Sequence, residues 1–230
     1  MRLGCFQSLF SDSRLSMSKK IKVGILFGGK SGEHEVSLVS ATSVYKALDK
    51  NKYDITMIGI DKTGRWLLPA ETEALIQSSN PRLFKLNQQQ QTVSFVPFQA
   101  ETQLVSMNQP DPTKHQFDVI VPILHGTYGE DGTIQGLLEL SNIAYVGSGV
   151  VGSSVGMDKD VSRRLLAQAG IPVVPTLTFR HHEFLKDAQA QIKKAVDELG
   201  LPFFVKPANA GSSVGVHKVK TLEDAFEQFQ

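Results

Sequence analysis

The chain has 230 residues, of which 41% are hydrophobic and 20% charged, an ordinary composition for a globular protein. Its formal net charge of +1 offers no basic surface of the kind that binds nucleic acid. The single cysteine, Cys5, excludes an internal disulfide and a cysteine-based metal site, and no apolar run is long enough to cross a bilayer. We therefore expect a cytoplasmic protein, of one large or two smaller domains, that contacts neither nucleic acid nor membrane.

Residues 1–16 differ from the rest of the chain. They hold several serines and scattered apolar residues but not the continuous apolar core of a signal peptide. Met17 lies directly before the first clear strand. We predict that translation starts at Met17 and that residues 1–16 are a disordered extension, with a short targeting arm as the alternative.

The next part predicts an α/β fold. Strands are expected over residues 21–27 and 53–60, and between them a helix over residues 33–48 with apolar residues at helical spacing. This β-loop-α-β order predicts a parallel, doubly wound sheet. Residues 61–116 contain a glutamine run and a polar, proline-containing stretch, and we expect short strands and loops at the edge of the sheet.

Further elements complete a first domain over residues 17–157 and begin a second over residues 158–230. The first continues with a strand over 117–124, a glycine-rich loop over 125–132, a helix over 133–140, a short strand over 144–146 and a turn of small residues over 147–156. The second is predicted to hold a helix over 157–169, a strand over 173–179, a helix over 182–199, strands over 203–206 and 214–219, and a helix from Thr221.

Three glycine-rich polar loops follow strands, where a doubly wound sheet binds ligands, and they predict one cleft: residues 28–35, 125–132 and 206–215. Backbone N–H groups and hydroxyls in the third loop can surround anionic oxygens, and Lys206 supplies a positive charge beside them. An ammonium at the end of an apolar strand is costly unless an anion meets it. A phosphate-binding loop is therefore favoured, although an ordinary hairpin loop also fits this stretch.

The first of these loops also permits a dinucleotide site, which needs an acidic residue about twenty positions further on. Asp61 lies at the end of the second strand but is more distant than that. Glu33 and Glu35 would lie at a helix N-terminus, where they suit a substrate ammonium better than a phosphate, with helix capping as the alternative for one of them. Taken alone, His125 fits a structural histidine and Lys159 a solvated surface lysine.

Together these motifs resemble the D-alanine–D-alanine ligase family of the ATP-grasp superfamily. The resemblance runs from about Lys20 to the chain end, with the motifs in the family's order, and residues 61–116 resemble its longer branch. The matching stretches are residues 28–37, 125–136, 145–149, 157–159, 204–207 and 211–215.

The resemblance implies a Rossmann-like (pre-ATP-grasp) domain followed by the incomplete first part of an α+β ATP-grasp domain. It implies that ATP phosphorylates the carboxylate of one D-alanine, that the amine of a second attacks the acyl phosphate, and that Mg²⁺ neutralises the phosphates. The dipeptide would feed peptidoglycan synthesis. D-alanine and ATP are the implied partners, and we expect the full-length enzyme to be a homodimer.

The resemblance also implies roles for individual residues. Glu33 would hold the ammonium of the first D-alanine, His125 would lie near its carboxylate, and Ser212 would orient the substrate and the closing loop. The expected nucleotide-binding residues are Lys159, Lys206 and Ser213.

The sequence departs from the family's pattern at Gln230, before the family's mobile tyrosine loop, its arginine and its metal ligands. We therefore assign no metal ligand, predict no preference between D-alanine and D-lactate, and expect the 230 residues to be inactive alone. Two other interpretations stay open: a nicotinamide-dependent oxidoreductase built on residues 28–32, and a non-catalytic nucleotide-binding fragment. Binding of ATP compared with NAD separates the ligase from the oxidoreductase.

Overall fold

The computed structural model describes residues 19–68, 80, 91–95, 104–106 and 116–228. The predicted extension at residues 1–16 lies outside the described residues, as does most of the edge region between residues 69 and 115. None of the helices in the described ranges combines the length and the apolar character that a bilayer span requires.

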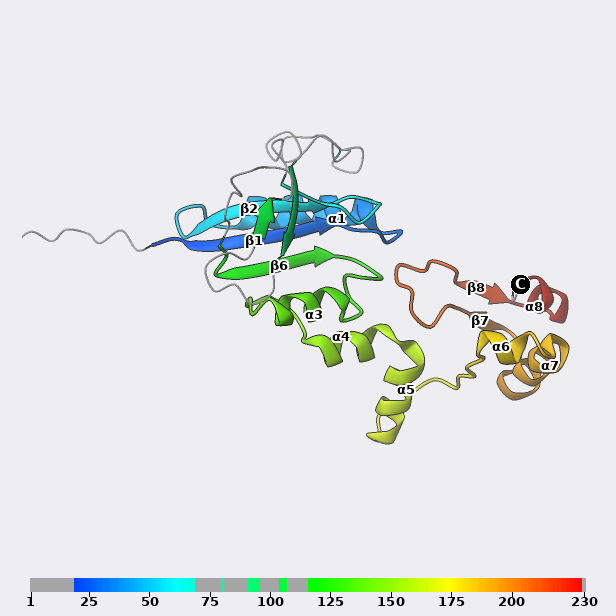
Figure 1. Ribbon diagram of the computed structural model, residues 1–230. Coiled ribbons are helices and arrows are strands. Elements are labelled where there is room, and N and C mark those ends of the chain that lie inside the picture. Colours follow the sequence, from blue (N-terminus) through cyan, green and yellow to red (C-terminus); the bar gives the residue numbers. More distant parts are fainter. Residues whose placement is uncertain (1–18, 69–79, 81–90, 96–103, 107–115, 229–230) are drawn as a thin grey trace, which may run out of the picture.

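A six-stranded sheet forms the first part of the molecule (Figure 1). Its order is β5-β4-β3-β2-β1-β6, and β1 runs parallel to both β2 and β6, as the β-loop-α-β order predicts. Strands β3, β4 and β5 are antiparallel, so the sheet is mixed and the region after Asp61 extends its β2 edge. The strands are β1 (Ile21–Gly28), β2 (Tyr53–Ile60), β3 (Trp66–Leu68), β4 (Gln91–Phe95), β5 (Leu104–Ser106) and β6 (Val119–Leu124).

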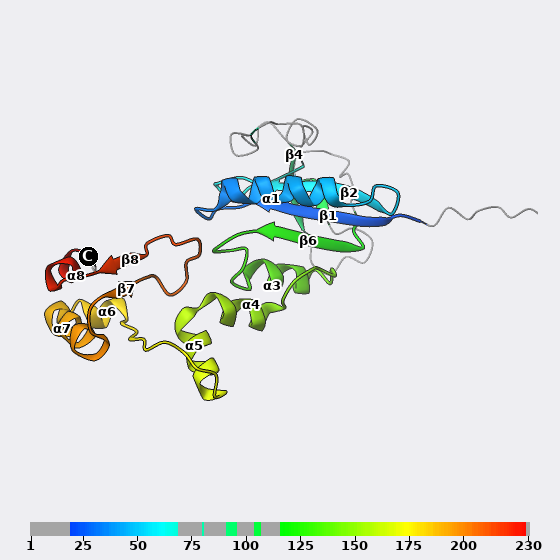
Figure 2. The ribbon, with the colours of Figure 1, turned by 180° about the vertical axis from the view of Figure 1, so that it is seen from behind.

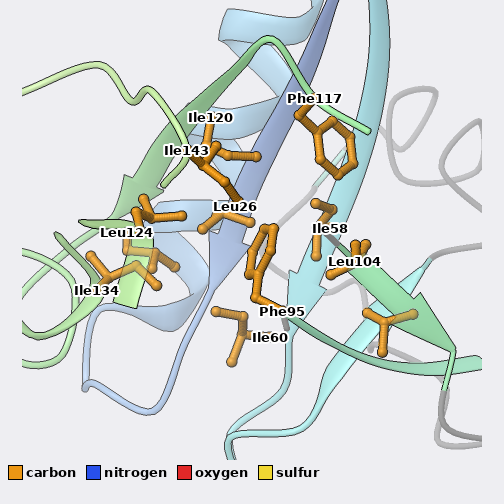
Figure 3. Packing of buried hydrophobic residues seen from close by; sticks show 12 residues of the cluster. Leu26, Ile58, Ile60, Phe95, Leu104, Phe117, Ile120, Leu124, Ile134 and Ile143 are labelled. Carbon is orange, nitrogen blue, oxygen red and sulfur yellow. The ribbon is translucent and has the colours of Figure 1, made fainter. Parts of the chain in front are cut away.

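Helices cover both faces of this sheet, which explains why its central strands are almost continuously apolar. Helix α1 (His34–Ala47) packs Leu38 and Ala41 against one face (Figure 2), together with Val23, Ile25, Phe27 and Met57. Helix α3 (Thr133–Leu140) packs on the other face. Figure 3 shows that second core, which contains Leu26, Ile58, Ile60, Phe95, Leu104, Phe117, Ile120, Leu124, Ile134 and Ile143.

The second part of the chain has its own, smaller core. Between the two cores, helices α4 (Val150–Met157) and α5 (Lys159–Gln168) contain no buried residue. The boundary predicted between residues 157 and 158 falls between these two helices and stays a prediction. The remaining elements, α6 (His181–Phe184), α7 (Ala188–Leu199), β7 (Phe203–Val205), β8 (His217–Val219) and α8 (Leu222–Gln228), pack around Ile192, Ala195, Phe203, Val219 and Ala225.

Two predictions in this region were wrong, each for its own reason. Residues 147–156 were expected to form a turn, but most of them belong to α4. The Ser154 hydroxyl donates to the Asp131 carbonyl at 2.7 Å, which ties this glycine-containing helix to the end of the preceding loop. Residues 173–179 were expected to form a strand, but they pair with no described strand, and Pro175 has no N–H to donate.

Three boundaries also differ from expectation. The helix predicted over residues 182–199 is divided into α6 and α7, because Asp187 caps α7 by accepting from the Ala190 N–H at 2.9 Å. The strand predicted at residues 144–146 is reduced to one bridge between Tyr145 and Ile120. Strand β8 begins at residue 217 rather than at residue 214, so the loop before it is longer than the apolar alternation of the sequence predicted.

Two leucines of α3 give a matched test of the core on which the site is built. Leu138 is fully buried, whereas Leu140, on the same helix, is 59% exposed. Leu138→Ala is expected to lower the free energy of unfolding by about 2–5 kcal/mol, because the loss of buried methyl groups leaves a cavity. Leu140→Ala should change it by less than about 0.5 kcal/mol in the same urea titration. Equal losses would show that α3 does not pack as described.

Candidate active site

The three glycine-rich loops predicted to form one cleft meet at the carboxyl ends of β1 and β6 (Figure 1). The loop between β7 and β8 extends back from its hairpin toward these strand ends (Figures 1 and 2). Two side chains join the loops: Ser212 contacts Glu33, and Ser31 contacts the His125 loop. These contacts confirm that Glu33, His125 and Ser212 belong to one region.

Glu33 is the N-terminal cap residue of α1, but its carboxylate makes no capping hydrogen bond. Its Oε2 instead accepts from the Ser212 hydroxyl at 2.5 Å. A Cβ atom would lie 2.7 Å from its Oε1 at Gly211 and 3.1 Å from it at Gly126. The carboxylate therefore lies between two loops that approach it closely because they carry no side chain there.

Glu35, the other acid considered for a substrate ammonium, faces a different partner. It forms an ion pair with Lys62 at 2.5 Å, and this contact lowers the pKa of Glu35 below its ordinary value. Glu33 makes no capping hydrogen bond, whereas Glu35, in the first turn of α1, also accepts from its own backbone N–H, so the capping alternative stays open for Glu35. Of the two, Glu33 is the one in contact with the β7–β8 loop.

Two serines hold His125. Ser31 Oγ donates to the His125 carbonyl at 2.6 Å and accepts from the Glu33 N–H at 3.2 Å. Ser40 Oγ lies 3.1 Å from His125 Nε2. Neither serine was among the predicted site residues. For Ser40, the sequence did contain a signal. Ser40 lies three residues after another serine, Ser37, and this spacing places both side chains on one face of α1.

Lys159 is neither a solvated surface lysine nor a free cation. Its Nζ donates to the Ala210 carbonyl at 2.5 Å, and its backbone N–H donates to the Ala208 carbonyl at 3.1 Å. Asp158 supports the same loop by accepting from Asn209 Nδ2 at 3.3 Å. A hydrogen bond from the Val161 N–H, with others from Asn209 and Asp160, lowers the pKa of Asp158. The start of α5 thus anchors the first arm of the glycine-rich loop.

Lys206 follows β7 and is exposed, so the expectation that its ammonium needs an anionic partner to offset burial was wrong. It lines an open cavity of about 870 Å³ together with Lys159, Arg163 and the residues of β7. That volume is in the range of small-molecule sites, and cations beside apolar walls suit a phosphate-bearing ligand. Ser213 is exposed and lies outside this lining, in a left-handed backbone conformation with φ of 59°.

The described residues show no metal-binding group, and the acid considered for a dinucleotide site has other partners. Within the described ranges, no group of three or more histidine, cysteine or acidic side chains could hold a metal ion. Asp61, the acid that a dinucleotide site would need, accepts from the Thr63 N–H at 2.8 Å and from Arg65 Nε at 3.0 Å. Burial raises the pKa of Asp61, but these hydrogen bonds outweigh it and leave the pKa lowered. Asp61 therefore closes the turn into β3.

Two glycines give a matched test of the contact between Glu33 and the loop. Gly211→Ala places a methyl group against the carboxylate and is expected to break the Ser212 hydrogen bond. Gly32→Ala is the control, because a Cβ there meets no heavy atom within 4 Å. Amide hydrogen exchange over residues 211–216 should become faster on the order of tenfold in Gly211→Ala alone, as expected for a lost charge-assisted hydrogen bond. Unchanged exchange in Gly211→Ala would contradict the contact.

Comparison with known proteins agrees with this geometry. A family model described as "D-ala D-ala ligase N-terminus" matches residues 22–148, and one described as "D-ala D-ala ligase C-terminus" matches residues 165–229. A D-alanine–D-alanine ligase of Shouchella clausii is 47% identical over 218 residues, which cover 91% of this chain and 58% of that protein.

Solved structures give the same result. The D-alanine–D-alanine ligase of Coxiella burnetii is 35% identical with a TM-score of 0.78, and the VanG D-Ala:D-Ser ligase of Enterococcus faecalis is 33% identical with a TM-score of 0.74. Each match covers 91% of this chain and 59% of the other, so the chain spans less than two thirds of these relatives. Because the N-terminal family model alone covers more than half of the chain, the chain belongs to the D-alanine–D-alanine ligase family and has the ATP-grasp fold over the part that it shares with these structures.

Proposed function

We propose that the chain supplies the first-substrate site and part of the nucleotide site of an ATP-dependent ligase that joins two D-alanines. The observation that carries this proposal is the Glu33 carboxylate, which lies between the His125 loop and Ser212 of the glycine-rich loop. Family membership supports the reaction class. The product would serve peptidoglycan precursor synthesis in the cytoplasm.

Glu33 is suited to bind the ammonium of the first D-alanine. Its Oε2 already accepts from Ser212, and a substrate ammonium would add a charge-assisted hydrogen bond to the same carboxylate. His125 would then lie near the substrate carboxylate, held by Ser31 and Ser40. Ser212 would couple the position of the substrate to that of the loop, since its hydroxyl contacts the group that holds the substrate.

The nucleotide would lie beside the β7–β8 loop. Bound ATP would supply the phosphoryl group that activates the first carboxylate as an acyl phosphate, which the amine of the second D-alanine then displaces. Lys206, exposed at the cavity, is free to meet a phosphate, and Ser213 would assist from the loop. Lys159 donates to the Ala210 carbonyl, and its ammonium, which has three N–H groups, would meet a phosphate with a remaining one. The described residues offer no ligand set for Mg²⁺, and we assign no step to it.

D-alanine is the proposed second substrate because the Shouchella clausii relative is a D-alanine–D-alanine ligase at 47% identity. The similarity to VanG of Enterococcus faecalis, a D-Ala:D-Ser ligase, makes D-serine the alternative. That the longer enzyme is a homodimer stays a prediction, which light scattering tests. Inactivity of the 230 residues alone also stays a prediction, and D-alanine-dependent phosphate release from ATP tests it.

Glu33 and Glu35 give a matched test of the substrate site. Glu33→Gln keeps the shape of the side chain but removes the charge that would pair with the substrate ammonium. D-alanine affinity, measured by isothermal titration, is expected to fall on the order of tenfold to a hundredfold, with ATP affinity unchanged. Glu35→Gln should leave both affinities unchanged, since Glu35 pairs with Lys62.

Two results would count against the proposal. Loss of ATP affinity without loss of D-alanine affinity in Glu33→Gln would assign this loop to the nucleotide. Tighter binding of NAD than of ATP by the unmodified chain would favour the oxidoreductase instead.

A further inference from the structure

Three serines connect the start of α1 to the end of β6. Ser31 donates to the His125 carbonyl at 2.6 Å, and the fully buried Ser37 donates to the Ile123 carbonyl. Ser40 meets the His125 ring at 3.1 Å. These pairs are between 85 and 94 residues apart in sequence, so they fix the relative position of two segments that only the fold brings together.

Ser40 differs from the hydroxyl-bearing residues that follow it on the same helix. Thr42 donates to the Leu38 carbonyl at 2.8 Å and Ser43 to the Val39 carbonyl at 3.0 Å, which is the usual behaviour of a helical hydroxyl. Ser40 instead forms its hydrogen bond with a side chain of another segment. Its hydroxyl therefore serves a site outside its own helix.

We propose that Ser40 is a positioning residue that fixes the orientation of the His125 imidazole for the first substrate. The inference rests on the proposed role of His125 beside the substrate carboxylate. The Ser40 hydroxyl can donate to Nε2 or accept from it, so the contact is compatible with either tautomer and fixes where Nε2 points. Ser31 holds the backbone of the same residue, so the ring can turn only about its own side-chain bonds.

This arrangement has a consequence for binding. A histidine whose ring is held in advance presents one defined nitrogen to the ligand and loses less conformational entropy when the ligand binds. Without the Ser40 hydroxyl, Nε2 loses this partner and the ring can populate other orientations. Molecules whose His125 ring presents the wrong nitrogen or orientation do not bind well. The measured affinity for D-alanine therefore falls as their fraction grows.

The experiment uses the full 230-residue chain labelled with ¹⁵N-histidine, with His125→Gln to assign the His125 signals. The ¹⁵N resonances of the two ring nitrogens report which of them carries the proton. Ser40→Ala removes the hydroxyl, and Ser40→Thr retains one. Ser43→Ala is the matched control, because it makes the same substitution at an exposed position of the same helix. D-alanine affinity is measured for each variant by isothermal titration.

In Ser40→Ala, the His125 ring signals are expected to shift because Nε2 loses its hydrogen-bond partner, and D-alanine affinity to fall about threefold to tenfold. Ser40→Thr and Ser43→Ala should resemble the unmodified chain in both measurements. Unchanged ring signals in Ser40→Ala would overturn the proposal, and so would shifted signals with unchanged D-alanine affinity. If the unmodified chain binds no D-alanine, the proposed function fails, whereas the ring signals still decide whether Ser40 holds the imidazole.

Discussion

The hydrogen bond between Glu33 and Ser212 is the contact on which the arrangement of the site depends. It joins residues 179 positions apart and links the sheet domain to the loop of the β7–β8 hairpin. Two residues earlier, Lys159 holds the same loop, since its ammonium donates to the Ala210 carbonyl. The first half of the loop is thus attached to a carboxylate of the sheet domain and to an ammonium at the start of α5.

Helix α1 contributes to the fold and to the site with different faces. Leu38 and Ala41 are buried against the sheet and give the helix its stability, since an isolated helix of this length is marginal in water. Its first turns carry Glu33 and the serines that reach β6 and His125. A site built on a packed helix is held more rigidly than one built on loops alone. The core therefore determines where the Glu33 carboxylate and the His125 ring lie.

Much of the fold follows from the sequence because apolar periodicity determines which faces are buried. The bounds of β2 and α3 agree with expectation, and Glu33 was singled out by charge at a helix N-terminus. Two of the failures share a cause. The helix over residues 150–157 depends on a contact with the Asp131 carbonyl, and the position of Lys159 depends on carbonyls about fifty residues away. Local sequence carries no information about such distant partners.

The glycine-rich motifs that carry the family resemblance have more than one physical meaning. Gly126 has a φ of 71°, a left-handed conformation that disfavours other residues, and it also lies against Glu33. Gly211 needs no unusual backbone angle, yet a Cβ there would lie 2.7 Å from the same carboxylate. Gly126 is favoured mainly by its backbone conformation, whereas a side chain at residue 211 would displace the carboxylate, which is the movable end of Glu33. The glycines of two distant loops thus let both loops approach the same carboxylate.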